Sequence, residues 1–376
     1  MTFGAELGVP STSTVTDWVT AVSQLVFTLV FLMLLFGFNQ RIQVYMWSRS
    51  IRSKLAVLED LARDGKSKVI DFLKSLGADR AEELTNKFID YFVIEPVDIE
   101  PIDIIKRLDH ILRVRELRLE EVIREHLRGI NESLRSLAYS SLEIVLALHF
   151  IFKYVRHLLL TGQKTNNWVL IMQLEMLMPT ILRQAQTYRR ALDVFMEGKP
   201  IGDGIGPLVA FNLVRFAERK ELVKDTVFSE VELEGRKLYV VKAKGPDSNV
   251  GHPGEAVEKL VNMLIQQNQS IGMIITIDAA LKLEGEETGS IAEGVGAAIG
   301  DPGPEKIRIE RVAAAHNIPL HAIVIKMSME EAVLEISKEI AQAAQSVTER
   351  VRELVRRCQP GSSVIIVGIG NTMGIV

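Results

Sequence analysis

The hydrophobic and polar positions of the chain form three successive patterns after a short N-terminal segment, residues 1–17. Residues 18–38 are apolar without a single charge, and residues 39–197 repeat apolar positions at helical spacing. Residues 198–376 alternate short apolar runs with glycine-rich turns, and 19 of the 26 glycines fall in this part. These patterns predict a membrane span, an all-helical module and an α/β domain.

The stretch 18–38 has the length of a transmembrane helix. Its 21 residues would extend about 31 Å, close to the roughly 30 Å hydrocarbon thickness of a bilayer. A cleaved signal peptide would begin with basic residues, whereas residues 1–17 carry only Glu6 and Asp17. The span is followed by the basic residues Arg41, Arg49, Arg52 and Lys54. Because positive charge stays on the cytoplasmic side, we expect a single-pass cell-membrane protein with its N-terminus outside.

The middle region, 39–197, has the features of a packed helical module. Its stretches 142–160 and 168–182 are apolar, but the first carries Lys153 and the second Glu175 and Pro179. We interpret both as core helices, with helices lying on the membrane surface as the alternative. The module suggests no chemistry, and self-association into a homo-oligomer is its predicted role.

Composition narrows the functional classes. The 44 basic and 48 acidic residues give a formal net charge of −4, which offers no concentrated positive surface for nucleic acid. Cys358 is the single cysteine, so an internal disulfide and a thiolate metal cluster are both excluded.

Strands and helices alternate after residue 198, which predicts a three-layer α/β domain with a mostly parallel sheet. An acidic, glycine-rich loop at 281–304 suits either cation binding or a mobile lid. The expected strands are 227–233 and 237–243, joined by a turn at Glu234-Gly235, then MIITID ending at Asp278, 321–326 and 363–372. The expected helices are a helix of about fourteen residues from Pro207, then 254–267, 305–316 and 329–357.

Candidate binding residues lie where strands end, because the carboxyl ends of parallel strands form the ligand site of such sheets. Asp278, Lys326 and the segment GIGN hold these positions. The turn GDGIGP places glycines around Asp203 before a helix, which suits an anion or metal near the backbone or, equally, a helix-capping turn. The glycine and asparagine candidates for ligand binding are Gly202, Gly204, Gly206, Gly368, Gly370 and Asn371. His252 precedes a helix and is interpreted as structural or merely exposed.

Two resemblances rest on these motifs. The whole chain, through EGEETGSIAEGVGAAIGDPGPEK, IKMSMEEA and VGIGNT, resembles an archaeal family of membrane-anchored proteins of unknown function. Residues 198–376 resemble the hydrogenase-maturation-protease and germination-protease-like fold in GDGIGPLVAFNL and IITIDAALKLEGEETGSI. That resemblance implies that Asp203 and Asp278 bind a divalent metal or take part in peptide hydrolysis. Lys326 stands where the maturation proteases have a histidine, and a protonated lysine cannot ligate a metal.

Two functions follow from these residues. The first is a membrane-anchored, cytoplasm-facing peptidase-like hydrolase, in which Asp203 and Asp278 share a proton or polarise water. Lys326 would lower their pKa values or, alternatively, bind an anionic ligand as a point charge. The second is a non-catalytic ligand-binding or scaffolding protein that oligomerises at the membrane. A dehydrogenase of the isopropylmalate type also carries GDGIGP, but the strand and the arginine cluster that it needs are missing here.

The last strand should hold an unusual place. Residues 364–367 are four consecutive β-branched, apolar positions, as expected for a central parallel strand. The resembled fold has a strand directly before its acidic turn, whereas residues 180–197 read as helix. We therefore predict a circular permutation, in which strand 364–367 pairs with the strand ending at Asp278 and Gly368–Asn371 lie beside Gly202–Asp203.

Overall fold

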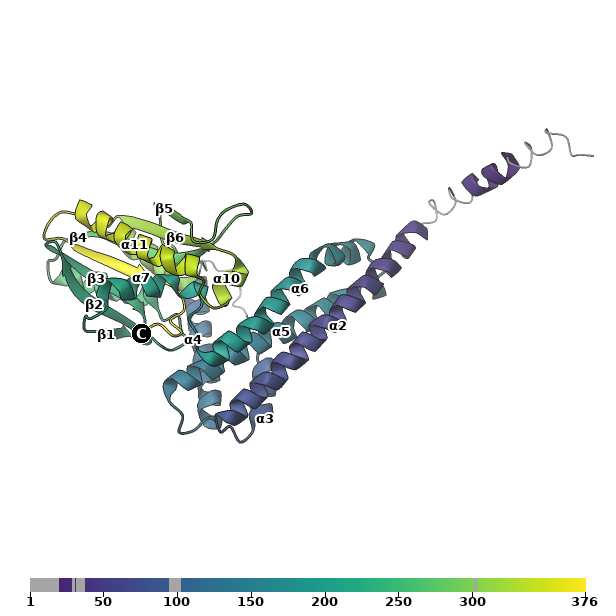
Figure 1. Cartoon of the computed structure of the whole chain (residues 1–376), viewed down its shortest axis with the longest axis horizontal. Helices are drawn as coiled ribbons and strands as arrows, with labels where there is room; N and C mark the ends of the chain where they lie inside the picture. The colour runs from purple at the N-terminus through teal and green to yellow at the C-terminus, as the bar shows by residue number, and fades with distance from the viewer. Residues whose placement is uncertain (1–19, 29–30, 32–37, 95–102, 301–302) are drawn as a thin grey trace, which may run out of the picture. The chain divides into compact units, whose positions relative to one another are not determined.

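The computed structural model describes residues 20–28, 31, 38–94, 103–300 and 303–376 (Figure 1). Most of the expected membrane span, 18–38, lies outside these residues, although 20–28 are helical with exposed side chains. The chain divides into two compact units. We call residues 1–58 with 152–182 the distal helical unit, and residues 59–151 with 183–376 the main unit.

Three long helices each have one part in the distal helical unit and the other part in the main unit. They are α2 (Phe38–Ser75), α5 (Glu132–Lys164) and α6 (Trp168–Glu197). Within the distal helical unit, α5 and α6 approach closely at Gly162, where a Cβ would lie 2.6 Å from Ile171 Cδ1. The α2 helix is tied to α6 by an ion pair of 2.6 Å between Lys54 and Glu175.

The helical part of the main unit also contains α3 (Ala81–Ile89) and α4 (Ile104–His126). Its apolar core is made of Leu73, Leu84, Phe88, Leu119, Ile123, Leu142 and Val145, among others. The all-helical N-terminal half predicted from the sequence is confirmed.

Among the described residues, α5 is the one helix long and apolar enough to cross a membrane. Its first half, however, buries Leu142 and Val145 in the core of the main unit. Core helices of soluble domains can also have the length and the apolar composition of a membrane-spanning helix. We therefore keep the interpretation of α5 as a core helix.

The C-terminal half forms one mixed seven-stranded sheet in the order β1-β2-β3-β7-β4-β6-β5. Its strands are β1 (Lys220–Val223), β2 (Thr226–Leu233), β3 (Arg236–Ala243), β4 (Ile271–Leu281), β5 (Ile291–Val295), β6 (Leu320–Met327) and β7 (Ser363–Gly368). The β2–β3 hairpin turns at Glu234-Gly235, both with positive φ, as two-residue hairpins require.

The sheet is mixed rather than mostly parallel, which corrects the prediction. The β3–β7, β7–β4 and β4–β6 pairs are parallel, while β1–β2, β2–β3 and β6–β5 are antiparallel. The two strands that the sequence did not predict, β1 and β5, lie at the sheet edges. Edge strands are short and half polar, so they lack the apolar pattern of buried strands. In particular, β5 lies inside the acidic stretch that was expected to be a loop.

Helices cover both faces of the sheet, which confirms the three layers (Figure 1). One apolar core joins the sheet to α7 (Ile205–Val214) and α11 (Lys338–Arg357). The other joins it to α8 (Pro253–Gln266) and α9 (Pro304–Ala315). The helix expected at 329–357 is interrupted after a short α10 (Met329–Val333), because Ser337 caps a new helix and accepts a hydrogen bond from Ile340 N.

The last strand, β7, lies at the centre of the sheet, as predicted. All six of its residues are buried, and it pairs in parallel with β3 on one side and with β4 on the other. Ile277 of β4 pairs with Gly368, so the ends of the two strands meet at one edge. The sequence thus places its final apolar run between two strands that precede it by many residues.

Candidate functional site

The ends of β4 and β7 bring Asp203 and Asp278 together. Asp203 lies in a single 3₁₀ turn (Gly202–Gly204) before α7, and its Oδ2 accepts a hydrogen bond of 2.9 Å from Asn371 N. Asp278 accepts hydrogen bonds from Ala279 N at 2.7 Å and Gly300 N at 3.1 Å. The predicted proximity of GIGN to the Asp203 turn is therefore confirmed.

The glycines of these two turns allow backbone segments of this chain to touch. A Cβ on Gly206 would lie 2.2 Å from Ile369 O and 2.4 Å from Ile277 O. Gly370 has a φ of +129°, and its Cβ would lie 2.0 Å from Asp203 O. Because neighbouring backbone fills the space that a side chain would need, these glycines pack the turn against the strand ends.

The two carboxyl groups are buried together, which favours their neutral forms. Burial raises the pKa of Asp203 despite the hydrogen bond from Asn371. Burial and, secondly, the negative charge of Asp203 raise the pKa of Asp278 to about 8, and the two backbone N–H groups offset only part of this. The raised pKa favours the protonated form of Asp278 at neutral pH, and the two neighbouring carboxyl groups form an acid pair.

Lys326 does not serve this pair, which corrects the predicted effect on their pKa values. Its ammonium group forms an ion pair with Glu286 in the loop after β4. In the sheet register Asp278 lies opposite Val324, whereas Lys326 lies two residues further along β6, opposite Ala280. Lys326 is therefore paired with the loop carboxylate of Glu286 and not with the acid pair. The pKa values of Asp203 and Asp278 are raised rather than lowered.

A cavity of about 380 Å³ opens in the main unit beside the end of β7. Its walls come from α4 and α5 on one side and from Asp225, the segment 247–252 and Asn371 on the other. Asn371 thus contacts the cavity with its side chain and the acid pair with its backbone N–H. The acid pair itself is not part of the cavity lining.

Hydroxyl and amide groups line the wall of the cavity next to Asn371. Ser248 Oγ accepts hydrogen bonds from Ser140 Oγ at 2.8 Å and from Asn371 Nδ2 at 3.2 Å. Ser136 Oγ donates to Ser248 O at 2.9 Å. Asn249 Oδ1 is buried and accepts no hydrogen bond from any described residue. Because this atom has almost no accessible surface, it does not face the cavity, and the wall offers the serine hydroxyl groups and the Asn371 amide to a bound molecule instead.

Of the residues in this wall, the sequence pattern predicts only Asn371 as a ligand-binding residue. Ser133, Ser136 and Ser140 recur at i, i+3 and i+7 in α5, so one helix face carries three hydroxyls. That spacing was the available signal, but small polar residues on a helix are common, and their partner Ser248 lies more than a hundred residues away.

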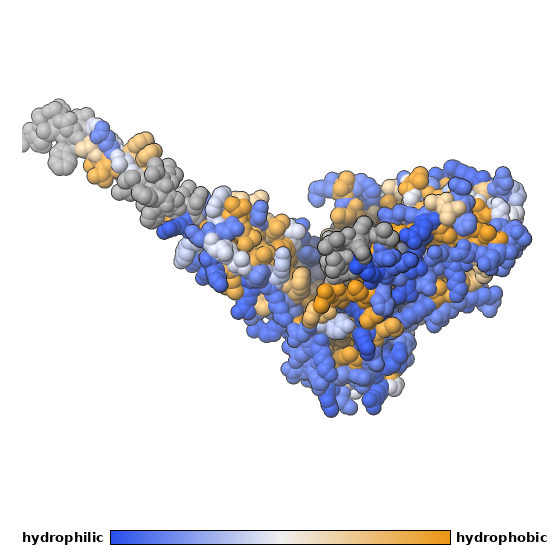
Figure 2. All heavy atoms as spheres, turned by 180° about the vertical axis from the view of Figure 1, so that it is seen from behind, coloured by the Kyte–Doolittle hydropathy of each residue, from blue (hydrophilic) through white to orange (hydrophobic). Residues whose placement is uncertain are grey.

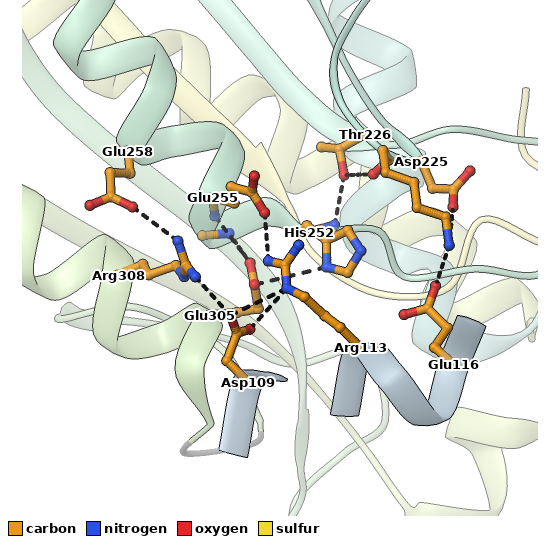
Figure 3. Close-up of polar contacts among 12 residues, drawn as sticks. Asp109, Arg113, Glu116, Asp225, Thr226, His252, Glu255, Glu258, Glu305 and Arg308 are labelled. Atoms are coloured by element: carbon orange, nitrogen blue, oxygen red, sulfur yellow. Dashed lines mark hydrogen bonds and ion pairs between the residues drawn. The ribbon is translucent and has the colours of Figure 1, made fainter. Parts of the chain in front are cut away.

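Ion pairs next to the cavity hold α4 against the α/β domain (Figure 3). Arg113 of α4 contacts Glu255 at 2.5 Å, and Arg308 of α9 contacts Asp109 of α4 at 2.9 Å. The ring of His252 is 3.9 Å from Glu305 and lines the cavity. His252 therefore has a structural position at the start of α8, as interpreted from the sequence.

One cluster of carboxylates has the spacing of a metal site, but a lysine occupies it. Glu116, Glu120 and Asp225 form the single such group among the described residues. Lys224 Nζ lies 2.9 Å from Glu116, 2.8 Å from Glu120 and 3.8 Å from Asp225. Burial lowers the pKa of Lys224, but its bonds to Glu120 and Glu116 outweigh this and raise it. The ammonium group therefore takes the place that a cation would hold.

Comparisons with known proteins agree with the division into halves. Residues 25–198 match the model "Protein of unknown function (DUF1512) N-terminal domain", and residues 201–376 match "Domain of unknown function (DUF1512) C-terminal". No curated protein matches the chain.

Among solved structures, a PAC2 family protein from Streptomyces avermitilis is 10% identical over 43% of this chain and 83% of its own, with a TM-score of 0.31. A proteasome-assembly chaperone homologue from Mycobacterium tuberculosis is 10% identical over 43% of this chain and 93% of its own, with a TM-score of 0.24. Similarities this low carry no functional argument.

Proposed function

The chain belongs to the DUF1512 family, and we propose that it is a membrane-anchored protein that binds a small polar molecule in the cavity beside β7. The cavity is the observation that carries this proposal. Its volume of about 380 Å³ falls within the range of small-molecule sites. It also adjoins the carboxyl end of a central parallel strand, where α/β sheets bind their ligands.

The lining indicates a polar ligand that donates hydrogen bonds. Glu132 and Asp247 place carboxylates in the wall of the cavity, and a carboxylate accepts hydrogen bonds. Acidic and basic side chains both line the cavity, while Leu112, Ile123 and Tyr139 give it an apolar side. An amino-bearing or zwitterionic metabolite with a small apolar part satisfies these groups.

Binding would tie the helical half to the α/β domain. The cavity walls come from α4 and α5 and from the 247–252 segment, so a bound molecule contacts both. A ligand that requires both walls stabilises their association by mass action, about 2.7 kcal/mol at a hundredfold excess over the Kd. The proposed function is therefore ligand sensing or ligand-dependent scaffolding at the membrane.

Thermal unfolding of the full-length, detergent-solubilised protein tests this proposal. The probes are free amino acids, polyamines, nucleosides and phosphorylated sugars. We expect one class to raise the Tm of the wild type and not of Ser140→Leu, which fills the cavity. Ser346→Leu, at an exposed position of α11, is the matched control and should keep the shift. If no class shifts the wild type and native mass spectrometry detects no co-purifying molecule, the proposal fails.

The second candidate is the peptidase-like hydrolase, which the buried acid pair favours. Asp203 and Asp278 are close enough for the charge of one to raise the pKa of the other, and such pairs can polarise a water molecule. The pair does not fit a hydrated divalent cation, because both carboxyl groups are buried with raised pKa values and no third carboxylate or histidine joins them among the described residues. We interpret the central β7 as the circularly permuted first strand of the resembled fold.

Conservative variants separate the two candidates. Under the hydrolase proposal, Asp203→Asn and Asp278→Asn abolish cleavage of a quenched fluorescent peptide library, with and without added Mg²⁺. Under the binding proposal, both variants keep the ligand-induced Tm shift. The absence of cleavage by the wild type under all these conditions would reject the hydrolase.

The membrane anchor and the homo-oligomer complete the proposal. The uncharged stretch 18–38 and the basic residues after it support a single span with the main unit in the cytoplasm. Resistance to carbonate extraction tests the anchor, and light scattering of the detergent-solubilised protein tests self-association.

A further inference from the structure

The distal helical unit has a charge opposite to that of the whole chain. Its segments 39–58 and 152–182 contain seven basic residues and one acidic residue, Glu175, whereas the whole chain has a net charge of −4. The basic residues are Arg41, Arg49, Arg52, Lys54, Lys153, Arg156 and Lys164. Glu175 is already paired with Lys54. These two segments therefore carry a formal excess of six positive charges.

One exposed face of α6 in this unit has no charge at all. Val169, Gln173, Met176, Leu177 and Thr180 recur at i, i+4, i+7, i+8 and i+11 and are all exposed. Met176 is 71% exposed and Leu177 56% exposed. A helix face turned to water normally carries charged residues. An uncharged, partly apolar face of this length indicates a surface that is covered by something else.

The first half of α2 adds apolar residues to the same unit. Ile42, Tyr45 and Met46 are exposed and alternate with Arg41 and Arg49. Figure 2 shows apolar residues at the surface of the helices that follow the N-terminal segment. The mixture of apolar, aromatic and basic residues is typical of helices that lie at a membrane interface.

The tryptophans, like the excess of basic residues, are confined to the distal helical unit and the uncharged stretch that leads into it. Of the three tryptophans, Trp47 and Trp168 lie in the distal helical unit, and Trp18 belongs to the uncharged stretch 18–38 that leads into α2 in the sequence. Trp47 and Trp168 are half-buried. Tryptophan is enriched at the headgroup level of membranes, where its ring is apolar and its N–H remains hydrated.

We propose that the distal helical unit docks on the anionic surface of the lipid bilayer, with its exposed basic residues on lipid phosphates and Met176 and Leu177 among the headgroups. This inference rests on the proposed anchor, because the uncharged stretch 18–38 leads directly into α2 and holds the unit near the bilayer. A second copy of the chain is a poorer occupant of this surface, since two units with the same positive excess repel each other. An anionic leaflet attracts them instead.

The charge makes a quantitative expectation possible. Each Lys or Arg near an anionic leaflet contributes about 1 kcal/mol, which is about fivefold in the docking equilibrium. Replacing Arg49, Arg156 and Lys164 by glutamine should therefore weaken docking by about a hundredfold. All three side chains are exposed, so their replacement leaves the core of the unit intact.

The test uses the full-length protein in nanodiscs of phosphatidylcholine, with or without phosphatidylglycerol. Cys358→Ser removes the native thiol, and Met176→Cys carries an environment-sensitive fluorophore. A reporter on Ser346→Cys, exposed on α11 of the main unit, is the control. Arg49→Gln, Arg156→Gln and Lys164→Gln are combined in one variant. Its matched variant replaces three exposed basic residues of the main unit, Arg311, Lys338 and Arg357.

When phosphatidylglycerol is present, we expect the emission of the fluorophore at position 176 to shift to the blue and to be quenched by spin-labelled lipid. Without phosphatidylglycerol, at high salt or in the triple variant, the emission should be that of a fluorophore in water. The matched variant should behave as the wild type does. A fluorophore at 176 that stays in water in both nanodiscs overturns the proposal. The proposal is also overturned, in favour of self-association, if the fluorophore is buried only in nanodiscs that hold two copies of the protein. Its burial would then be insensitive to phosphatidylglycerol and to salt. Carbonate extraction reports on the anchor separately, so failure of the anchor is not confused with failure of docking.

Discussion

Replacing Asp278 by asparagine should change how the stability of the α/β domain depends on pH. Asp278 is 5% exposed, and burial together with the charge of Asp203 raises its pKa from 3.8 to about 8. A carboxyl group whose pKa is higher in the folded state keeps its proton longer than in the unfolded chain. The folded state therefore loses stability as the pH rises from about 4 to about 8.

The magnitude follows from the size of the shift. A rise of about four pKa units, at 1.36 kcal/mol each, amounts to roughly 5 kcal/mol once both states are ionised. Between about pH 4 and pH 5 the folded state loses only the free energy that corresponds to about one pKa unit. The wild type should therefore lose about 4 kcal/mol of its free energy of unfolding between pH 5 and pH 9 through this group. Asparagine cannot ionise, but it replaces one oxygen that accepts from Ala279 or Gly300 by an amide nitrogen. This substitution costs about 1 kcal/mol at every pH.

Urea unfolding of the detergent-solubilised wild type and variant, followed by circular dichroism across this pH range, measures both effects. We expect Asp278→Asn to be slightly less stable than the wild type in acid and clearly more stable in alkali, so that the two curves cross. Asp79→Asn, at an exposed position, is the matched control and should follow the wild type. Parallel curves for the wild type and Asp278→Asn would refute the argument that burial keeps this carboxyl protonated.

The fold and the proposed membrane topology can also be tested by mutation. Deleting residues 363–376 should abolish folding of the α/β domain, seen as loss of its cooperative unfolding transition, because β7 pairs with both β3 and β4. Gly206→Ala should destabilise the domain by more than about 2 kcal/mol in the same urea assay, since its Cβ would meet two backbone oxygens. Gly294→Ala, which meets nothing, should change stability by less than about 0.5 kcal/mol. In the Cys358→Ser background, a membrane-impermeant maleimide should label Ser11→Cys in intact cells and should not label Ser346→Cys; the reverse pattern would invert the proposed topology.

The features that the sequence predicted are those that a short run of residues determines. Four β-branched residues in β7 could only suit a central strand, and the turn at Asp203 lacked a preceding strand. Combined with the resemblance to the maturation-protease fold, in which a strand directly precedes the acidic turn, they placed Asn371 beside Asp203, where the hydrogen bond is found. The hairpin at Glu234-Gly235 likewise follows from a glycine, which accepts positive φ, between two runs of strand-forming residues.

The features that could not be predicted depend on partners far along the chain. The cavity needs serines of α5 to meet Ser248, more than a hundred residues later, and no local pattern encodes that contact. Lys326 was placed correctly at the end of a strand, but its partner Glu286 comes from a loop whose path the sequence leaves open. The edge strand β5 was missed because IAEGV has no apolar alternation.

The central position of the last strand sets the order of events during synthesis. About 120 residues separate the end of β3 from the start of β7, and at about 5–20 residues per second a ribosome needs roughly 6 to 24 s to make them. Until β7 is made, the edges of β3 and β4 that will pair with it carry N–H and C=O groups without hydrogen-bond partners. The nascent sheet must therefore be protected from aggregation until β7 has been made, and any chain that is cut short before β7 keeps both open edges permanently. Such fragments would be natural substrates for the cell's proteolytic quality control.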